Sequence, residues 1–183
     1  MVQGLQQALT RRFVLTGAPG AGKTSILQAL AAEGFATVGE AATDLIAREQ
    51  GAGTAEPWTD PGFIDRIVDL QRERRLTVTG DVQFHDRSAF CTEALADYLG
   101  HPHGAGLVRE IEELKRTGFY ERRVFFVDLL GFVEPTAARR ISLEESRRFA
   151  EIHEHVYRAH GFELVRIAPA SVVERVAAIH AAL

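Results

Sequence analysis

The chain has 183 residues, of which 46% are hydrophobic and 25% are charged, and this composition predicts a single domain over residues 1–183. Its net charge of -4 argues against sequence-independent binding of nucleic acid, which requires clustered Lys and Arg side chains. Cys91 is the only cysteine and no apolar run could span a bilayer, so we expect a reduced cytoplasmic setting, no cysteine-based metal site, no signal peptide and no membrane insertion.

The first predicted element is an apolar strand over residues 13–15, and a glycine-rich stretch follows it. Residues 17–25 read GAPGAGKTS and have the form G-x-x-x-x-G-K-[ST], between a predicted strand and a predicted helix. Glycine permits backbone conformations in which successive N–H groups turn inward around a phosphate. We therefore predict a nucleotide-phosphate site made of Gly17, Ala18, Pro19, Gly20, Ala21, Gly22, Lys23, Thr24 and Ser25.

Two residues of this stretch have separate predicted roles. Lys23 can place a positive charge near the β and γ phosphates, and Thr24 can supply a hydroxyl ligand to Mg²⁺ at a helix N-terminus that favours negative charge. A dinucleotide-binding fingerprint is rejected because G-x-G-x-x-G starting at Gly20 would need glycine where Ser25 stands. The remaining alternative is a glycine-rich turn that binds nothing.

Further strand candidates follow, with helical patterns between them. They lie at residues 35–38, 82–85, 124–127 and 162–167. Strands that alternate with helices form βαβ units and a mainly parallel sheet that is covered on both faces. The predicted fold class is therefore α/β, a three-layer α/β/α sandwich with a five-stranded sheet.

Glu40 follows the second strand, at the carboxyl edge of the sheet, where ligands bind in open α/β proteins. It could accept a proton from a hydroxyl acceptor or hydrogen-bond that hydroxyl; the alternative is a carboxylate favoured by the dipole of the following helix. Trp58, the only tryptophan, lies in a later loop, where packing is favoured over stacking on a substrate ring.

The third strand delivers Asp86, Arg87 and Ser88 to the same edge. A carboxylate at a strand end is needed to hold Mg²⁺, and Asp86 competes for this role with Asp128 after the fourth strand. We prefer Asp86, because the adjacent Arg87 could bind an acceptor or a transferring phosphate, whereas two leucines after Asp128 indicate packing. The alternative for the Asp-Arg-Ser stretch is a helix N-cap with an ordinary ion pair.

The other cysteine and histidine positions predict no catalytic or metal site. Cys91 is expected to be a small buried hydrophobe on the helix after the third strand. His101 and His103 have no further ligand at a familiar spacing, and His153 and His155 lack the i, i+4 spacing of a zinc protease helix.

Arg139 and Arg140 come after the fourth strand and just before a helix that opens with a capping box, Ser142 with Glu145. A kinase must exclude water from the γ-phosphate and bring positive charge to it, usually with a closing segment. We therefore predict a lid over approximately residues 129–142 that carries both arginines; the alternative is ordinary solvated surface.

The stretches GAPGAGKTS, VGEAA, PWTDP, FHDRS and ARRIS…EES together resemble a known family. They are similar to the bacterial AAA-type P-loop ATP-binding proteins related to the nicotinamide riboside kinase domain and to the TRPL translocation defect protein. The resemblance implies a nucleoside-kinase-like P-loop NTPase with strand order 2-3-1-4-5 and a lid. It also implies Glu40 as the acceptor-side carboxylate, Asp86 and Arg87 as the pair on the third strand, and Arg139 or Arg140 as lid residues. DLLGFVEP departs from the proline- and tryptophan-containing turn expected after the fourth strand.

The expected function is that of an ATP-binding phosphotransferase, a Mg²⁺-dependent kinase of a small metabolite such as a nucleoside, nucleotide or related compound. Its partners would be a nucleoside triphosphate and an unidentified small-molecule acceptor. The alternative is a nucleotide-switched ATPase or GTPase that binds a lipid or protein partner. The predicted catalytic residues are Lys23, Glu40, Asp86, Arg87, Arg139 and Arg140, and the predicted metal ligands are Thr24 and Asp86.

Overall fold

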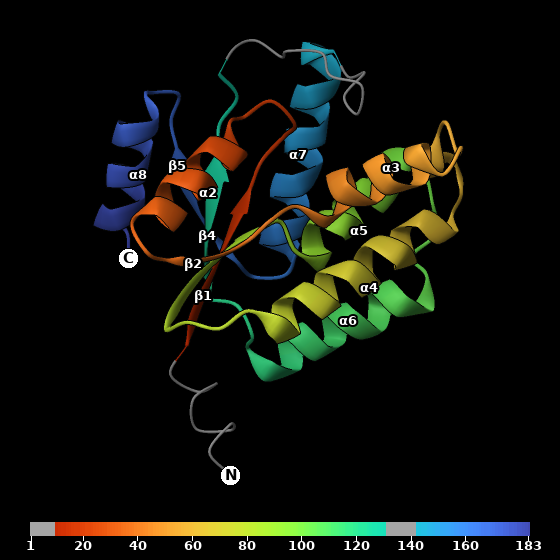
Figure 1. Ribbon diagram of the computed structural model, residues 1–183, viewed down its shortest axis with the longest axis horizontal. Coiled ribbons are helices and arrows are strands. Elements are labelled where there is room, and N and C mark those ends of the chain that lie inside the picture. The colour runs from red at the N-terminus through yellow and green to blue at the C-terminus, as the bar shows by residue number, and fades with distance from the viewer. Residues whose placement is uncertain (1–9, 131–141) are drawn as a thin grey trace.

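A computed structural model describes residues 10–130 and 142–183 and contains a parallel sheet flanked by helices (Figure 1). The strands are β1 (Arg11–Thr16), β2 (Ala36–Val38), β3 (Val82–Asp86), β4 (Arg123–Val127) and β5 (Glu163–Ile167). The helices are α2 (Lys23–Ala32), α3 (Ala41–Gly51), η1 (Pro57–Thr59), α4 (Gly62–Thr77), α5 (Ala89–Leu99), α6 (Ala105–Thr117), α7 (Leu143–Ala159) and α8 (Val172–Ala181). The strands pair in parallel in the order β2-β3-β1-β4-β5, so the predicted fold class and strand order 2-3-1-4-5 are confirmed.

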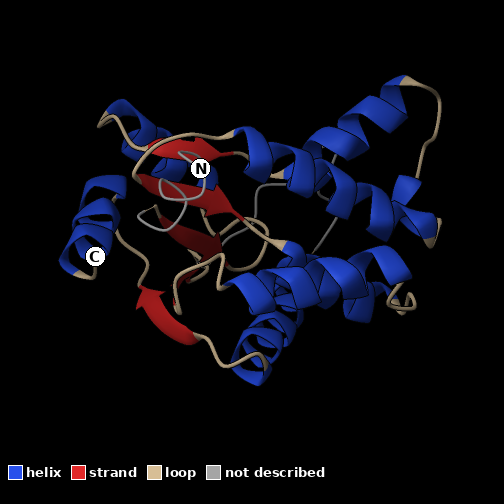
Figure 2. Cartoon of the chain, turned by 90° about the horizontal axis from the view of Figure 1, so that it is seen from below, coloured by secondary structure: helices blue, strands red, loops and turns tan. Residues whose placement is uncertain are grey.

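Helices cover both faces of the sheet (Figures 1 and 2). Successive residues of β1 belong to different apolar clusters. Val14 belongs to an apolar cluster that includes Phe90 of α5 and side chains of α4, α6 and α7. Phe13 and Leu15 belong to a second cluster with Ile26 of α2 and side chains of α8. This division follows from the two-residue period of a strand, and it produces the predicted three layers.

A third apolar cluster joins α3 to α4 beyond the edge of the sheet. Leu45 of α3 and Phe63 and Ile67 of α4 are fully buried there, and Trp58 of η1 packs against them. The cluster fixes the position of α3 and α4 beside α5, on the same side of the sheet (Figure 1). None of the helices in the described ranges is long and apolar enough to cross a membrane.

The strand register places the ends of four strands at one edge. Leu15 of β1 pairs with Asp86 of β3, Thr16 pairs with Phe126 of β4, and Val38 of β2 pairs with His85 of β3. Because the strands are parallel, the residues that follow each of them begin at this carboxyl edge. Ligands bind at such an edge in open α/β sheets, so a ligand site is expected there.

Candidate active site

The phosphate loop, residues 17–24, joins β1 to α2 and depends on glycine at several points. The φ angles of Gly17, Gly20 and Gly22 are 126°, 84° and 81°, in the range that a Cβ disfavours. A Cβ on Gly17 would lie 2.4 Å from the carbonyl oxygen of Val127, so the loop packs tightly on the end of β4. Gly22 is the N-cap of α2, and the unpaired N–H groups of that helix begin in the loop. Left-handed residues of this kind are what an anion nest uses to turn its N–H groups inward.

Lys23 begins α2 and folds its ammonium back over the loop. Its Nζ donates to the carbonyl oxygens of Gly17 at 3.1 Å and Ala18 at 3.0 Å, and the side chain is 6% exposed. Burial, together with the positive charge of Arg87, lowers the pKa of Lys23 to about 8, while the negative charge of Asp86 opposes this shift. A bound phosphate would add negative charge beside the ammonium and hold it in its protonated form.

Thr24 and Asp86 are the residues that could hold a magnesium ion. Thr24 is exposed in the first turn of α2, whereas Asp86 is buried at the end of β3, where its charge acts on both Lys23 and Arg87. Within the described residues, no three His, Cys, Asp or Glu side chains form a group that could hold a metal. One hydroxyl and one carboxylate nevertheless suit Mg²⁺, which takes its remaining ligands from substrate phosphates and water.

Asp128, the competing carboxylate, is tied to β5. Its Oδ1 accepts a hydrogen bond from Arg166 Nη1 at 2.7 Å, and its backbone N–H donates to the carbonyl oxygen of Ile167 at 3.0 Å. Arg166, which also pairs with Glu154, already contacts this carboxylate, which makes it less available to a cation. The pairing therefore favours Asp86 over Asp128 as the metal carboxylate.

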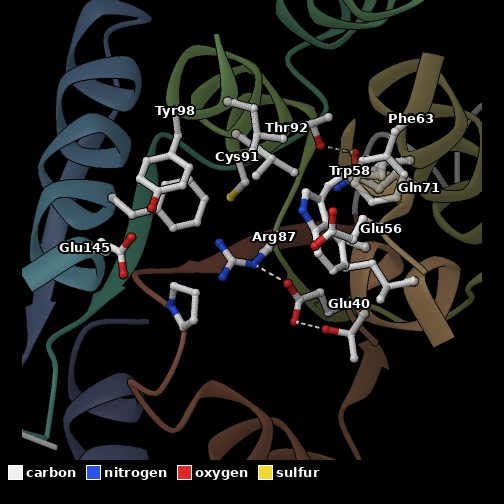
Figure 3. A pocket seen from close by; sticks show the side chains of 18 residues that line it. Glu40, Glu56, Trp58, Phe63, Gln71, Arg87, Cys91, Thr92, Tyr98 and Glu145 are labelled. Atoms are coloured by element: carbon white, nitrogen blue, oxygen red, sulfur yellow. Dashed lines mark hydrogen bonds and ion pairs between the residues drawn. The ribbon is translucent and has the colours of Figure 1, made fainter. Parts of the chain in front are cut away.

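A buried ion pair joins the residues that follow β2 and β3. Arg87 Nε donates to Glu40 Oε1 at 2.6 Å, and the Thr43 hydroxyl donates to Glu40 Oε2 at 2.9 Å (Figure 3). Burial by itself would raise the pKa of Glu40, but the charges of Arg87 and Lys23 outweigh it and lower that pKa. Burial would likewise lower the pKa of Arg87, and the Glu40 carboxylate raises it instead. Both side chains are therefore charged in the folded protein.

The second contact of Arg87 fixes the protonation state of His153, a buried residue of α7. Arg87 Nη1 lies 2.9 Å from His153 Nε2, and His153 Nδ1 lies 2.8 Å from the carbonyl oxygen of Phe149. A carbonyl oxygen can only accept, so Nδ1 carries the proton and Nε2 accepts from the guanidinium. Burial and the charge of Arg87 lower the pKa of His153 well below its usual value. His153 is therefore a neutral acceptor that connects α7 to Arg87.

The backbone of Arg87 is also unusual. In residues 10–130 and 142–183 it is the only non-glycine residue with a left-handed φ angle, 72°. Such conformations persist where the surroundings determine them. Here the Arg87 N–H donates to the carbonyl oxygen of Leu15 at 3.0 Å, while Glu40 and His153 hold the guanidinium.

A cavity of about 370 Å³ opens beside this ion pair, between α3, α4, α5 and α7 (Figure 3). It begins at Pro19 in the phosphate loop and contains a polar pair on one wall, where Thr92 Oγ1 donates to Gln71 Oε1 at 3.0 Å. The aromatic and charged side chains that line it are Trp58, Phe63, Tyr98, Phe149, Glu40, Glu56, Arg87 and Glu145. Three carboxylates and one guanidinium thus face a space whose other walls are aromatic and aliphatic.

The predicted catalytic residues fall into two groups. Lys23, Glu40, Asp86 and Arg87 meet at the carboxyl edge, since the charges of the last three all act on Lys23. Arg139 and Arg140 lie outside the described residues, as does most of the predicted lid, residues 129–142.

Trp58 and Cys91 have more contacts than their predicted packing roles require. Trp58 packs on the α3–α4 cluster and also lines the cavity. Cys91 is buried as expected, yet its Sγ lies 3.3 Å from Thr16 Oγ1 and 3.1 Å from the Tyr157 hydroxyl, and it too lines the cavity.

Several cavity residues are not identified by sequence reasoning. Phe63, Ile67 and Gln71 follow one another at intervals of four along α4, so Gln71 continues the buried face of that helix with a polar side chain. A polar residue at that spacing is the signal that could have identified it. Phe149 and His153 have the same spacing on α7, and no local pattern relates them to Arg87.

The comparisons with known proteins agree with this fold. A family model described as an AAA domain matches residues 12–175. A search of curated proteins found no match. A solved structure of NadR protein in complex with NR superposes with a TM-score of 0.68 at 16% identity, covering 97% of this chain and 52% of that chain. The NadR complex with NAD and AMP-PNP has a TM-score of 0.69 at 15% identity, with coverage of 97% and 50%.

A solved structure of deoxyadenosine kinase from M. mycoides with products bound superposes with a TM-score of 0.60 at 12% identity. The superposition covers 93% of this chain and 97% of that chain. This chain therefore spans about half the length of the NadR chains and nearly the whole deoxyadenosine kinase. At these identities the similarity supports the P-loop kinase fold.

Proposed function

The chain belongs to the AAA-domain family, and on that premise we propose that it is an ATP-dependent kinase that phosphorylates a hydroxyl group of a small metabolite. One observation carries the proposal: the Arg87–Glu40 pair lies between the phosphate loop and a cavity of about 370 Å³. Phosphoryl transfer requires a donor and an acceptor held in line, and a cavity of this size suits a small organic molecule.

The donor side of the site is the phosphate loop. Backbone N–H groups of the loop bind the phosphates, and Lys23 adds a positive charge at the β and γ positions. When bound between the phosphates, Thr24 and Asp86, Mg²⁺ would neutralise charge that develops on the transferring group. The pKa of Lys23, about 8, leaves most of the side chain charged at pH 7 before any nucleotide arrives.

On the acceptor side, Glu40 orients the hydroxyl group. Its lowered pKa makes it a weak base, because the ideal proton acceptor has a pKa near the working pH. Each carboxylate oxygen can still accept a second hydrogen bond beyond those from Arg87 and Thr43. Glu40 therefore holds the acceptor hydroxyl toward the γ-phosphate, and Arg87 keeps the carboxylate in place.

The lining of the cavity favours a particular kind of acceptor. The rings of Tyr98 and Phe149 pack with their centroids 4.8 Å apart, and Trp58 contributes a third ring surface. Aromatic walls suit a flat ring, and the Gln71 amide can hydrogen-bond its polar edge. Because three carboxylates face one guanidinium, an uncharged or cationic acceptor is favoured over a phosphate ester. A nucleoside or a related compound fits this description.

The test is a screen for acceptor-dependent ADP formation from ATP and Mg²⁺. Nucleosides, their 5′-monophosphates and unrelated alcohols are compared with a no-acceptor control, and an active acceptor is then titrated. Gln71→Leu, which removes the amide at similar volume, should raise KM for the acceptor roughly tenfold, the effect of about one hydrogen bond. Gln28→Leu on the exposed face of α2 is the matched control.

One outcome would contradict the preferred acceptor, and another would contradict the kinase assignment itself. If 5′-monophosphates are better acceptors than nucleosides, the charge argument is wrong although the kinase assignment stands. If ATP is hydrolysed slowly and no metabolite accelerates ADP formation, the nucleotide-switched alternative replaces the kinase.

A further inference from the structure

A buried arginine from the last helix contacts the phosphate loop and has no role in the mechanism above. Arg175 of α8 is 2% exposed, and its Nη2 donates to the carbonyl oxygen of Ala21 at 2.6 Å. The same nitrogen lies 3.5 Å from the carbonyl oxygen of Asp128 at the end of β4. One guanidinium therefore joins α8, the phosphate loop and β4.

Stability alone does not explain a guanidinium at this position. Arg175 Nε is buried and has no hydrogen-bond partner in the described residues, and burial lowers the pKa of the side chain while only Asp128 opposes it. A buried charge that is incompletely hydrogen-bonded costs free energy, and an apolar side chain of similar volume often replaces it without loss. The contact with Ala21 is thus the feature that needs explanation.

The geometry of one peptide group supplies that explanation. The described residues contain no cis peptide bond, so the carbonyl of Ala21 and the N–H of Gly22 point in opposite directions. By holding the Ala21 oxygen on the α8 side, Arg175 turns the Gly22 N–H away from α8. A Cβ on Gly22 would lie 2.9 Å from Arg175 Nη1, so the guanidinium occupies the space that glycine leaves open.

We propose that Arg175 is a positioning residue of the phosphate loop, which keeps the Gly22 N–H directed at a bound phosphate without contacting the phosphate itself. The inference rests on the proposed function only in that the loop must bind a triphosphate, and it holds whichever acceptor is used. Arg175 fixes the carbonyl side of the peptide and the phosphate binds the amide side.

The test separates positioning from charge by comparing two substitutions. Arg175→Lys retains the positive charge but not the planar guanidinium, whereas Arg175→Met removes both. Affinity for ATP and for inorganic tripolyphosphate is measured by calorimetry, with thermal unfolding as a check on folding. Arg166→Met is the control, because it also removes one arginine that contacts Asp128.

If Arg175 positions the peptide, Arg175→Lys weakens both ligands by about the same factor, roughly tenfold, as expected for the partial loss of a hydrogen bond to a charged donor. In amide NMR spectra, the shift of the Gly22 signal on adding tripolyphosphate should be smaller in Arg175→Lys than in the unchanged protein. Arg166→Met should leave both measurements unchanged. If Arg175→Met fails to fold, the affinity and the Gly22 shift of Arg175→Lys still test the positioning role.

Two results would overturn the inference, and they are distinguishable. A folded Arg175→Lys protein with unchanged affinity and an unchanged Gly22 shift overturns the positioning role alone. If Arg175 is merely structural, the substitution lowers the unfolding temperature but changes neither the affinity nor the Gly22 shift. Failure of the unchanged protein to bind ATP or tripolyphosphate overturns the proposed function and this inference together.

Discussion

Replacing Glu40 by Gln tests the ion pair at the centre of the site. The change keeps the size of the side chain and removes one negative charge. Arg87 is 7% exposed and Glu40 is 17% exposed, so the guanidinium would lose its only carboxylate partner in the described structure at a place that water reaches poorly. The substitution therefore affects both stability and acceptor binding.

The effect on stability follows from the geometry of the pair. Two unit charges roughly 4 Å apart attract by about 4 kcal/mol at an effective dielectric constant of about 20, and breaking a buried pair from one side costs about 3–5 kcal/mol. The single glutamine oxygen can still accept the hydrogen bond from Arg87, and the amide group can donate to the Thr43 hydroxyl instead of accepting from it, which recovers part of this. We expect the free energy of unfolding to fall by about 2–3 kcal/mol.

The effect on turnover should depend on the acceptor. Losing a residue that orients the acceptor hydroxyl should lower acceptor-stimulated ADP formation by roughly a hundredfold or more. ATP affinity and basal hydrolysis should change little, because water replaces the acceptor in hydrolysis and the Glu40 carboxylate is hydrogen-bonded to Arg87 and Thr43, not to the phosphate loop.

The assay combines urea unfolding with ADP formation measured with and without acceptor. Thr43→Val is the control, because it removes a hydrogen bond to Glu40 and leaves both charges in place. A double-mutant cycle with Arg87→Met isolates the pair itself, and we expect a coupling free energy of about 2 kcal/mol. Equal loss of basal and stimulated activity would place Glu40 at the metal or nucleotide instead. A coupling near zero would refute the electrostatic reasoning.

The remaining predictions concern the phosphate loop, the metal and acid stability. Lys23→Ala should weaken ATP binding and abolish turnover with the fold intact, and calorimetry showing unchanged affinity would contradict the loop assignment. Asp86→Asn should suppress Mg²⁺-dependent turnover while metal-free nucleotide binding stays nearly unchanged, and Asp128→Asn should lower that turnover less. A larger loss of turnover in Asp128→Asn would indicate that the metal binds at the end of β4. Burial lowers the pKa of His85 to about 3 and that of His153 well below its usual value, so below about pH 6.5 the unfolded chain binds more protons. The free energy of unfolding should therefore fall between about pH 6.5 and 4.5, by up to about 2.7 kcal/mol per pH unit, and an unchanged urea midpoint over this range would contradict the two neutral imidazoles.

Local patterns were sufficient to predict most of the sheet. Short apolar runs predicted all five described strands. The signal is clearest for β1 and β4, because a strand buried on both faces needs apolar residues at successive positions. The strand order came from the family resemblance and from no pattern within the strands. Helix α6 is not predicted from the sequence, because the proline and glycines of residues 101–106 indicate a turn. The helix nevertheless begins at Ala105 and is strongly amphipathic.

The cavity could not be predicted in the same way. Its walls come from four helices, and Gln71 and Phe149 line the same cavity only when α4 and α7 pack around α5. His153 is the clearest example of a site residue that local sequence patterns cannot identify. Its spacing from His155 excluded a zinc site, but its contact with Arg87 spans 66 residues, and no periodicity encodes a contact of that kind.

The contact between Arg175 and Ala21 has a consequence for protein synthesis. The two residues are 154 positions apart, and a ribosome that adds 5–20 residues per second would produce Arg175 roughly 8–30 s after Ala21. During that interval the glycine-rich loop exists on the nascent chain without the guanidinium that holds its peptide. A nucleotide would therefore bind the nascent chain less tightly until α8 has been synthesised, and products of premature termination before α8 would gain less protection from cellular ATP.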